Sequence, residues 1–420
     1  IVRELVDRKN SVVLVDHDPR ILMDADQLIE IGPGAGKEGG RIVTQGTPLE
    51  AEKNPHSLIG PYLSGKESLK VRSRATEKDM FENGSIRIKT KPFYTVKALD
   101  VSIPKGRMIA VTGVSGSGKT SLVIECLVPA LQAVIQGTKL PEHVDSIEAK
   151  GIQSVKVIDS KPIGANVRST VATYDGVFDD LRKLFARTAD AKAKGLTAGD
   201  FSYNTGKLRC PVCDGTGIIT MDVQFLPDVD TICPSCGGSR YGKDAYDILW
   251  KSKEKDSVSV SLPGLLKLTV EEAAGILHEE TKIAKQLKIL QDLGVCYLTL
   301  GEATPALSGG EAQRLKLAYE METPQQGSVF VFDEPTIGLH PQDVKKLVLI
   351  FDHLIQLGAT VIVIEHDLEL VTNCDYIIDM GPWGGTEGGR VVVEGTPEAV
   401  AATSESITGR YLKQELAEDK

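Results

Sequence analysis

The sequence has no apolar run that approaches the roughly 18 residues of a membrane-spanning helix, so we expect no membrane span. Positive charge is not in excess either, because 48 Lys and Arg against 58 Asp and Glu give a net charge of −10. A uniformly basic nucleic-acid-binding protein is therefore excluded, whereas a local basic patch is not. With 41% apolar and 25% charged residues, the composition is globular and excludes a disordered or collagen-like chain.

Cysteine is also scarce, and seven in 420 residues exclude a small secreted disulfide scaffold. Four of the seven form two C-x2-C pairs separated by 19 residues, Cys210 with Cys213 and Cys233 with Cys236. Two such pairs, each able to form a tight knuckle, suit one tetrahedral zinc site with four cysteine ligands. Two disulfides and a redox C-x-x-C motif are the alternatives. The pattern favours a reduced compartment, and we expect a cytoplasmic protein.

The sequence contains an internal repeat. Residues 11–48 and 360–397 align without gaps at an offset of 349 (360 − 11), and 16 of 38 positions are identical. This identity indicates a duplication in which each copy ends a similar domain. Since only ten residues precede the first copy, we expect a piece of a longer protein, with residues 1–60 as the tail of one domain and 61–85 as a linker.

Two expectations follow for the N-terminal part. The segment IVRELVDRKNSVVLVDHD predicts the end of a helix followed by a buried strand, and it lacks the pattern of a signal peptide. The charge run KESLKVRSRATEKD predicts that the linker is a solvated connector.

A glycine-rich loop predicts phosphate binding. The segment 113–120, GVSGSGKT, fits G-x-x-x-x-G-K-[ST] and stands between the apolar strand MIAVT and an apolar helix. Backbone N–H groups of such a loop face phosphate oxygens at a helix N-terminus. Lys119 would contact the β- and γ-phosphates, and Thr120 would hold Mg²⁺. The loop residues predicted to bind ATP are Gly113, Ser115, Gly116, Ser117, Gly118, Lys119, Thr120 and Ser121.

Acidic residues follow a second apolar run, SVFVFDEP. Asp333 would bind Mg²⁺, and Glu334 would orient or deprotonate the attacking water. The run TVIVIEHD ends in a similar way, and its His366 is predicted to sense the γ-phosphate. Both runs predict buried parallel strands, so the expected fold class is α/β.

The octet LSGGEAQR, residues 307–314, precedes a helical pattern. Ser308, Gly309 and Gly310 are predicted to form a second phosphate-facing helix end. The 220 positions between Gly113 and Asp333 (333 − 113) exceed what a compact core needs, which predicts an insertion. The expected segments of the second domain are its first part (86–149), the insertion (150–300) and its last part (301–420).

The octet resembles the signature of ABC-type ATPases, in which the signature of one domain closes over the P-loop nucleotide of another. The order of P-loop, zinc-bearing insertion and signature resembles the UvrA family of bacterial nucleotide excision repair. Further matches are YDGVFDDLRKLFA, FSYNTGKLRCPVC, DEPTIGLH and GPWGGTEGG. The resemblance implies an ABC-type P-loop ATPase domain with an inserted zinc-bearing α+β signature and DNA-binding domain.

The resemblance also implies ATP, Mg²⁺ and Zn²⁺ as cofactors and ATP-dependent recognition of DNA damage within an excinuclease of the SOS response. The implied partners are lesion-containing double-stranded DNA, a second copy of the protein and UvrB. Ser160 departs from the family pattern, because a glutamine that couples the γ-phosphate to the insertion is expected after Asp159. Asp16 also differs from Glu365 in the second copy. Composite sites need both halves, so this chain alone is expected to be a weak ATPase.

A local excess of basic residues lies in segment 150–209, with 11 Lys and Arg against 6 Asp and Glu. Such a strip would bind phosphates without reading base sequence, as a sensor of distorted DNA requires. The candidate contacts are Lys150, Lys156, Lys161, Arg168, Lys207 and Arg209. A UvrA-like ABC ATPase of drug export or resistance without a DNA role, and a non-catalytic DNA-binding scaffold, are the alternatives.

Overall fold

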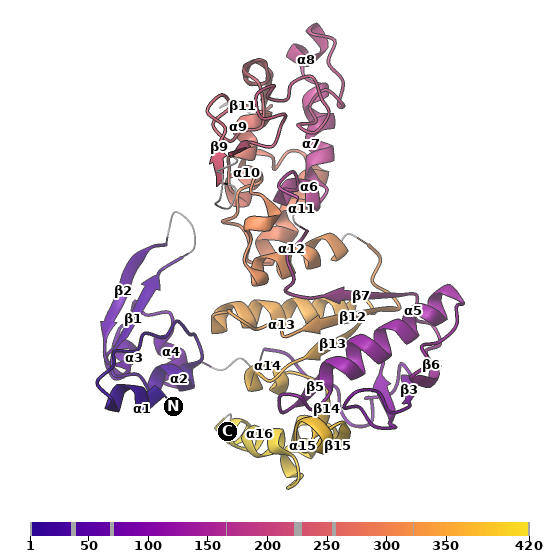
Figure 1. Ribbon diagram of the computed structural model, residues 1–420. Coiled ribbons are helices and arrows are strands. Elements are labelled where there is room, and N and C mark those ends of the chain that lie inside the picture. The colour runs from indigo at the N-terminus through magenta and orange to yellow at the C-terminus, as the bar shows by residue number, and fades with distance from the viewer. Residues whose placement is uncertain are drawn as a thin grey trace.

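The computed structural model describes residues 2–34, 39–67, 71–164, 166–221, 229–253, 258–321 and 323–418. Its centre is a six-stranded sheet that is parallel except at one edge (Figure 1). In spatial order the strands are β15 (Arg390–Gly395), β14 (Tyr376–Gly381), β5 (Met108–Gly113), β13 (Thr360–Ile364), β12 (Ser328–Asp333) and β7 (Ser154–Ile158). The predicted α/β fold and its buried parallel strands are confirmed.

Helices cover both faces of this sheet. The ring of Phe332 on β12 lies 4.4 Å from that of Phe351 on one covering helix. The neighbouring Val331 points to the opposite face and packs in the cluster that contains Leu131. Burial on both faces explains why the strands read as continuous apolar runs. The covering helices are α13 (Pro341–Gln356) on the first face, and the π-helix η2 (Ser121–Leu127) with α5 (Val128–Gln136) on the second.

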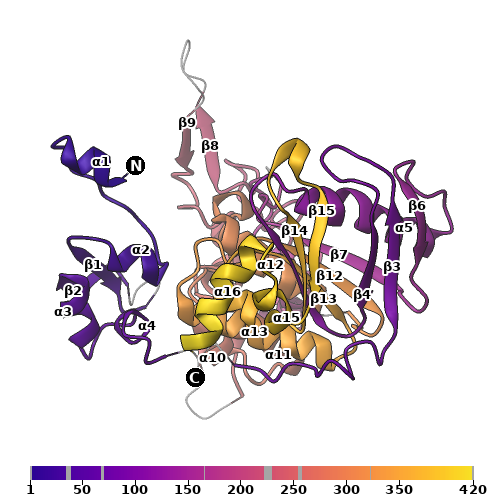
Figure 2. The ribbon, with the colours of Figure 1, turned by 90° about the horizontal axis from the view of Figure 1, so that it is seen from below.

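A smaller antiparallel sheet lies beside the central one (Figure 2). Its order is β4 (Asp100–Pro104), β3 (Ser85–Thr90) and β6 (Val144–Glu148). Ile86 and Ile88 of β3 are buried in the same cluster as η2 and α5. This sheet therefore encloses the helix that follows the glycine-rich loop.

The inserted segment leaves the central sheet after β7 and returns at β12, and these two strands are hydrogen-bonded neighbours. It forms an arm that stands on the sheet-containing body in Figure 1. The boundary predicted at residue 150 precedes β7, which is itself a strand of the body. The arm contains α6 (Val171–Tyr174), α7 (Val177–Ala186), α8 (Ala189–Ala193), β8 (Ile218–Met221), β9 (Val229–Ile232), η3 (Lys243–Asp247), β10 (Leu249–Lys251), β11 (Ser259–Ser261), α9 (Leu262–Leu266), α10 (Val270–Ile276), α11 (Thr281–Asp292), η4 (Thr304–Ala306) and α12 (Gly309–Met321).

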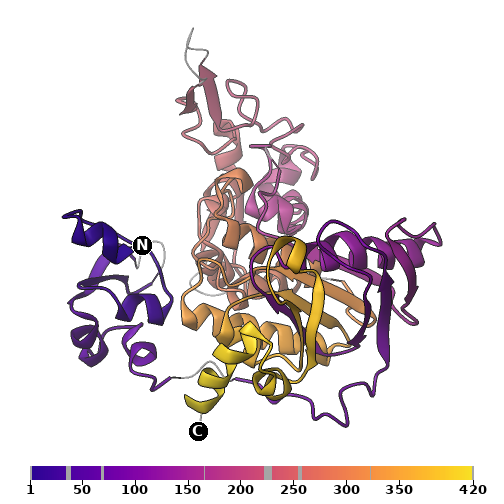
Figure 3. The same cartoon turned by 60° about the horizontal axis from the view of Figure 1, so that its bottom comes forward.

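The N-terminal unit lies beside the body, on the side where the C-terminal helix lies (Figure 3). It contains α1 (Val2–Asp7), α2 (Pro19–Met23), β1 (Leu28–Gly32), β2 (Arg41–Gly46), α3 (Pro48–Lys53) and α4 (Gly60–Leu63). The matching C-terminal elements, besides β14 and β15, are α14 (Leu368–Thr372), η5 (Gly385–Glu387), α15 (Pro397–Ala402) and α16 (Ile407–Glu418). In the part of the chain that the structure describes, no helix is long and apolar enough to cross a membrane.

The two units share irregular details as well as strands. The β1–β2 and β14–β15 hairpins shift register at equivalent positions, after Glu30 and after Asp379. Thr47 and Thr396, which are also equivalent, cap α3 and α15 with their side chains. The structure thus supports the duplication.

The buried strand predicted in the first copy does not form, so this prediction is wrong. Residues 11–15 have no strand structure, and Val13 and Val15 are 89% and 96% exposed. Their counterparts Ile362 and Ile364 lie fully buried in β13. β13 pairs with β5 and β12, whereas segment 11–15 has no such neighbours among the described residues. An apolar run becomes a strand only where a sheet completes its hydrogen bonds.

The linker, described again from residue 71, is only partly the solvated connector that was predicted, because some of its side chains dock on the body although most of its charged residues are exposed. Arg72 is 6% exposed at its side chain and pairs with Asp352 at 2.9 Å and Asp375 at 3.1 Å. Further along, Met80 is buried in the core. The polar sequence concealed this docking because its partners lie about 300 positions away.

Candidate nucleotide site and cysteine cluster

The glycine-rich loop joins the end of β5 to η2. Gly113, Gly116 and Gly118 have φ angles of 129°, 75° and 97°, which strain any residue with a side chain. A Cβ at Gly113 would also overlap the carbonyl oxygen of Met380. The turn therefore requires glycine at these positions of the motif. It leaves backbone N–H groups at the N-terminal end of a long helical segment. This arrangement favours an anion such as a phosphate group.

Lys119 lies within this loop. Its Nζ donates to the carbonyl oxygens of Gly113 at 2.8 Å and Val114 at 3.1 Å. Burial lowers the pKa of Lys119, and the nearby Glu334 carboxylate opposes that shift. The ammonium group of Lys119 thus has neutral carbonyl oxygens as partners. The oxygens of a bound phosphate would be charged acceptors and would form stronger hydrogen bonds with it.

Carboxylates gather at the ends of the neighbouring strands. Burial raises the pKa of Asp333 at the end of β12, and the charges of Glu334 and Asp159 add to this effect. A buried carboxylate among like charges gains from a bound cation, and oxygen ligands are those that Mg²⁺ prefers. The donor oxygens at this strand end thus have the chemistry that a magnesium ion requires.

Glu334 and His366 approach each other from different strands. Glu334 has a φ of 47°, a left-handed conformation that is uncommon for glutamate. Such a conformation persists where the surrounding structure holds the backbone in place, which is common at functional sites. Its Oε1 lies 3.9 Å from Nδ1 of His366, and their side chains are 42% and 65% exposed. The structure therefore places the predicted general base and phosphate sensor together.

Glu365 has a different role from its neighbour His366. Its side chain is fully buried and accepts hydrogen bonds from the backbone N–H groups of Thr336, His366 and Asp367, and from the Thr336 hydroxyl. It thereby ties the turn after β13 to the turn after β12. In the first copy, Asp16 makes the same kind of turn by accepting from the N–H groups of the next two residues. Sequence analysis missed this role, although the paired Asp16 and Glu365 pointed to it.

The signature octet begins helix α12. Ser308 and Glu311 form a reciprocal cap, in which Glu311 accepts from the Ser308 N–H at 2.7 Å and Ser308 accepts from the Glu311 N–H at 3.4 Å. A Cβ at Gly309 would lie 3.2 Å from the carbonyl oxygen of Ser160. The turn of Ser308, Gly309 and Gly310 is thus stabilised by a cap within its own segment, and it lies at the root of the arm.

Two side chains of α12 fasten this helix to the carboxylate-bearing strand ends. Gln313 is buried, and its Nε2 donates to the carbonyl oxygens of Ile158 at 3.1 Å and Asp333 at 3.4 Å. Lys316 donates to the carbonyl oxygens of Asp159 at 2.9 Å and Lys161 at 2.8 Å. Sequence analysis did not single out either residue, although both recur on one side of the helical pattern that follows the octet.

The four paired cysteines converge in the arm. The sulfur atoms of Cys210, Cys213, Cys233 and Cys236 all lie within 4.8 Å of one another. Zn–S bonds of about 2.3 Å in a tetrahedron place sulfurs roughly 3.8 Å apart. The Cys210–Cys233 and Cys213–Cys236 sulfurs are 4.0 and 3.7 Å apart, so the group fits a zinc ion. The N–H of Gly217 also donates to the Cys213 sulfur at 3.3 Å, as a ligand thiolate would require.

The predicted DNA contacts divide into inward and outward groups. Lys156 is only 10% exposed, with its Nζ 3.2 Å from a Glu320 carboxylate oxygen and 4.9 Å from the Phe330 ring centre. It cannot reach DNA in this position, so we withdraw it from the set. It lies on β7, a strand whose packing the basic composition of the segment did not reveal.

Arg168 and Arg209 both bind the cysteine knuckle. Arg168 lies 3.2 Å from one oxygen of Asp214, and Arg209 lies 2.7 Å from the other. Asp214 directly follows the second cysteine. Lys161 and Lys207, at 83% and 78% exposed, and the exposed Lys150 lie at the surface, where a phosphate backbone could contact them.

An aromatic residue that sequence analysis missed lies beside the glycine-rich loop. Tyr94 is 80% exposed with a φ of 50°. The adjoining Thr95 would lie 3.0 Å from a Cβ placed on Gly118 of the loop. Tyr94 rests on Phe93 at 4.3 Å, and Phe93 stacks on His143 at 3.9 Å between ring centres. The Phe–Tyr pair in the antiparallel segment just before the loop was the available signal.

Known proteins are similar in sequence to this chain along its full length. The chain is 43% identical over 425 aligned residues to the UvrABC system protein A of Staphylococcus aureus (strain COL), covering 100% of this chain. The corresponding identities for the UvrABC system proteins A of Aquifex aeolicus and Bacillus subtilis are 42% and 41%, again over 100% of this chain. The chain belongs to the UvrA family. No protein-family model matches the sequence.

A solved UvrA structure has the same fold. The crystal structure of UvrA2 from Deinococcus radiodurans matches with a TM-score of 0.89 and 38% identity, over 99% of this chain and 49% of that chain. This chain likewise covers 44% of the UvrA proteins of S. aureus and A. aeolicus and 43% of that of B. subtilis. It therefore spans somewhat less than half the length of the curated UvrA relatives that it matches.

Proposed function

We propose that the chain is the ATP-binding and zinc-bearing part of a UvrA-type protein that recognises damaged DNA in nucleotide excision repair. The proposal rests on one arrangement. The glycine-rich loop and the carboxylate-bearing strand ends share an edge of the sheet, and the arm with the cysteine cluster rises between β7 and β12. A site that binds nucleotide and a module that contacts DNA would thereby be joined through two neighbouring strands.

In this proposal the chain is part of an ATPase. Gly113 to Ser121 hold the phosphates, with Lys119 on the β- and γ-phosphates, and Thr120 and Asp333 hold Mg²⁺. The metal ion would neutralise charge on the phosphates as the bond to the γ-phosphoryl group breaks. Glu334 accepts a proton from the attacking water, and His366 contacts the γ-phosphate. Ser308, Gly309 and Gly310 offer a helix end to a nucleotide held by a second ATPase domain.

Such a composite site makes ATP a link between domains. We propose a cytoplasmic homodimer in which nucleotide binding fastens domains and hydrolysis releases them. The proposed links to UvrB, to the excinuclease and to the SOS response rest on membership of the UvrA family alone. The proposed cofactors are ATP, Mg²⁺ and Zn²⁺, with zinc on the four clustered cysteines.

DNA would contact the surface side of the arm and its root. Lys161 and Lys207 are the strongest candidates because their side chains are exposed. Lys150 is exposed as well, but it lies on the body, between β6 and β7. Arg168 and Arg209 would act chiefly by fixing the knuckle through Asp214. Contacts of this kind bind phosphates without base readout, which suits a search for deformable, damaged sites.

Binding to damaged and undamaged duplexes, with and without ATP and across a salt series, tests the proposal. We expect a preference for the lesion that ATP modulates and an affinity that falls with salt. An absence of DNA binding even at low salt would contradict the repair role and favour a UvrA-like ATPase of resistance or export. DNA binding without nucleotide turnover would favour a non-catalytic scaffold.

A further inference from the structure

We propose that Asp379 is a positioning residue for the phosphate loop, and that the loop is supported from behind by a strap that we define as residues 381–389. The proposal rests on the proposed ATP site and adds a support to it. Asp379 lies on β14 directly beside Thr112, the residue before the loop on β5. Among the described residues it accepts no hydrogen bond from the side chain of a predicted nucleotide ligand, although its charge also acts on Lys119.

Asp379 gathers hydroxyl groups from two parts of the chain. It is 2% exposed, and its Oδ1 accepts from the hydroxyls of Thr112 at 2.8 Å and Thr408 at 2.7 Å, while its Oδ2 accepts from Ser406 at 2.6 Å. Ser406 in turn accepts the N–H of Gly409, in the first turn of α16. One buried carboxylate therefore joins the strand that leads into the phosphate loop to the N-terminus of the last helix.

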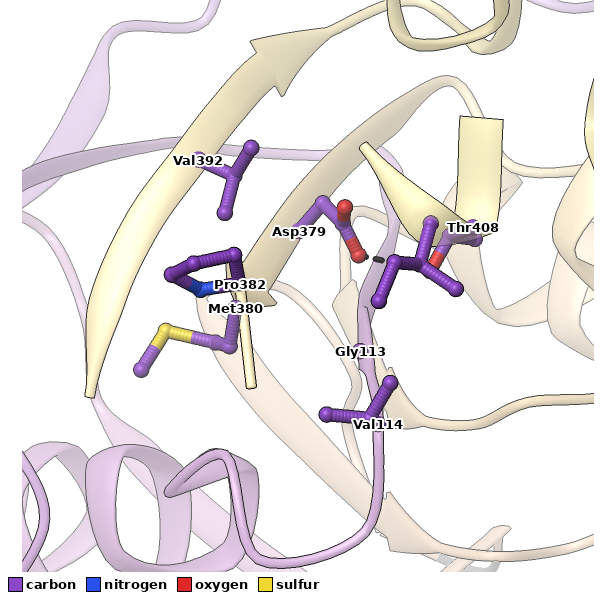
Figure 4. A pocket seen from close by; sticks show the side chains of 8 residues that line it. Gly113, Val114, Asp379, Met380, Pro382, Val392 and Thr408 are labelled. Carbon is purple, nitrogen blue, oxygen red and sulfur yellow. Dashed lines mark hydrogen bonds between the residues drawn. The ribbon is translucent and has the colours of Figure 1, made fainter. Parts of the chain in front are cut away.

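Figure 4 shows how this cluster lies behind the loop, with the Thr408 side chain directed at Asp379. The hollow around it, lined also by Gly113 and Val114, has no room for a water molecule. In this arrangement the carboxylate is satisfied by hydroxyl groups of the chain. The loop can therefore respond directly to a change in the cluster.

The strap reaches the loop from the same strand. The N–H groups of Gly385 and Gly389 donate to the carbonyl oxygens of Gly116 and Ser117, both at 3.1 Å. A Cβ on Gly384 would lie 2.6 Å from the Ser115 carbonyl oxygen. Because the backbones of the strap and the phosphate loop touch directly, these contacts can form only when the loop has its present conformation.

The strap also reaches the turn that carries Tyr94. The carbonyl oxygen of Gly389 accepts the N–H of Lys97 at 2.9 Å, and a Cβ on Gly389 would overlap the Thr95 carbonyl oxygen. The segment after Asp379 thus lies between the phosphate loop and the exposed aromatic ring. Its glycines explain why GPWGGTEGG is so rich in that residue.

The first copy offers a natural comparison. Glu30 stands in the place of Asp379 and accepts from the Ser57 hydroxyl at 2.6 Å, as Asp379 does from Ser406. Its other oxygen accepts from the N–H of Leu58 at 2.7 Å instead of from a residue that leads into a phosphate loop. The shared part of the cluster therefore holds the tail, and the contact with Thr112 is the part specific to the nucleotide site.

The test compares Asp379→Asn and Thr112→Val with Glu30→Gln as the matched control. ATP affinity is measured with a fluorescent ATP analogue, KM and kcat are measured separately, and thermal unfolding reports the stability of each variant. We expect Asp379→Asn to weaken nucleotide binding about tenfold, as for loss of one charge-assisted hydrogen bond, and to raise KM more than it lowers kcat. Glu30→Gln should leave nucleotide affinity unchanged even where it lowers the unfolding temperature.

Wild-type affinity in Asp379→Asn and Thr112→Val would overturn the inference. If Asp379→Asn fails to fold, Thr112→Val decides, because it keeps the charge and removes only the hydroxyl contact that is specific to the nucleotide site. An equal loss of affinity in Glu30→Gln would also overturn it, since the effect would then be general destabilisation. A wild-type protein that binds no ATP would instead refute the proposed ATPase, so the two failures are distinguishable.

Discussion

The carboxylate of Glu334 and the imidazole of His366 lie 3.9 Å apart, although they follow two different strands, β12 and β13. The buried Glu365 holds both turns in place by accepting N–H groups from each of them. The pair is therefore set by the sheet and not by flexible side chains. A water molecule that attacks a γ-phosphate at this edge would lie within reach of both groups.

Glu334→Gln should bind ATP and fail to turn it over. The amide keeps the size of the side chain and loses the ability to accept a proton, so we expect kcat to fall by about 100-fold or more. Nucleotide binding and phosphate release are the two measurements. Glu271→Gln, on the exposed side of α10, is the control that should retain turnover, and unchanged turnover in Glu334→Gln would remove Glu334 from the catalytic role.

Cys213→Ser should lose bound zinc and disorder the knuckle, since three thiolates and a hydroxyl make a much weaker site. Metal content by elemental analysis, with release followed by a chromogenic chelator, checks this. Cys296→Ser removes a cysteine outside the cluster and should keep the full zinc content. A full zinc complement in Cys213→Ser would rule out the four-cysteine site.

Lys207→Ala and Lys161→Ala should each weaken DNA binding and make it less dependent on salt. Each removes one exposed ammonium, so the slope of log K against log salt should decrease by about one. Lys346→Ala, on α13 of the body, should bind DNA as the wild type does. If both arm variants keep the wild-type slope, DNA contacts another surface.

Tyr94→Ala should weaken ATP binding, because the ring stands exposed beside the phosphate loop where a base could stack on it. We expect a loss of about 1–3 kcal/mol in binding free energy, the usual range for base stacking on an aromatic side chain. Tyr94→Phe should bind normally, and Tyr246→Ala in the arm should have no effect. Equal binding of ATP and of inorganic triphosphate would show that Tyr94 does not contact the base.

Glu369→Gln should stabilise the protein in a pH-dependent way. Burial raises the pKa of Glu369 to about 8, and the neighbouring Asp367 adds to the shift. The folded state therefore holds a proton that the unfolded state releases above its ordinary pKa, so stability falls as pH rises from about 4.5 to about 8.

The substitution removes this dependence. The melting temperature of Glu369→Gln should exceed that of the wild type by about 2–4 °C near pH 8.5, and the difference should vanish near pH 4.5. Thermal unfolding across this range is the measurement. A difference that does not change with pH would contradict the raised pKa.

The residues of the nucleotide site could be predicted because their signals are local. A glycine loop between a strand and a helix, an acidic pair after an apolar run and two cysteine knuckles each carry their chemistry within a few positions. The sheet then brings the glycine loop and the acidic pair to one edge, because β5, β13 and β12 are parallel, whereas the cysteine knuckles meet in the arm. The roles of these residues in binding and turnover still await the experiments above.

Contacts between distant segments could not be predicted in the same way. Lys156 reads as a basic surface residue, yet its strand pairs with one from 174 positions later (328 − 154) and buries it. Asp379 reads as the end of a strand, yet it joins β5 to the last helix. Val13 and Val15 have the sequence pattern of a buried strand. They are exposed because no strand among the described residues pairs with them.

The arm is rooted on two strands that are neighbours in the sheet, and this has a mechanical consequence. Adjacent strands lie about 4.8 Å apart, so both roots share a base far narrower than the arm is long. A force at the cysteine knuckle acts on this base as a lever. Asp333 ends β12 and Asp159 directly follows β7, so each root of the arm adjoins a carboxylate. A displacement of the arm at its root would therefore shift Asp159 and Asp333, the second of which is the carboxylate proposed to hold Mg²⁺.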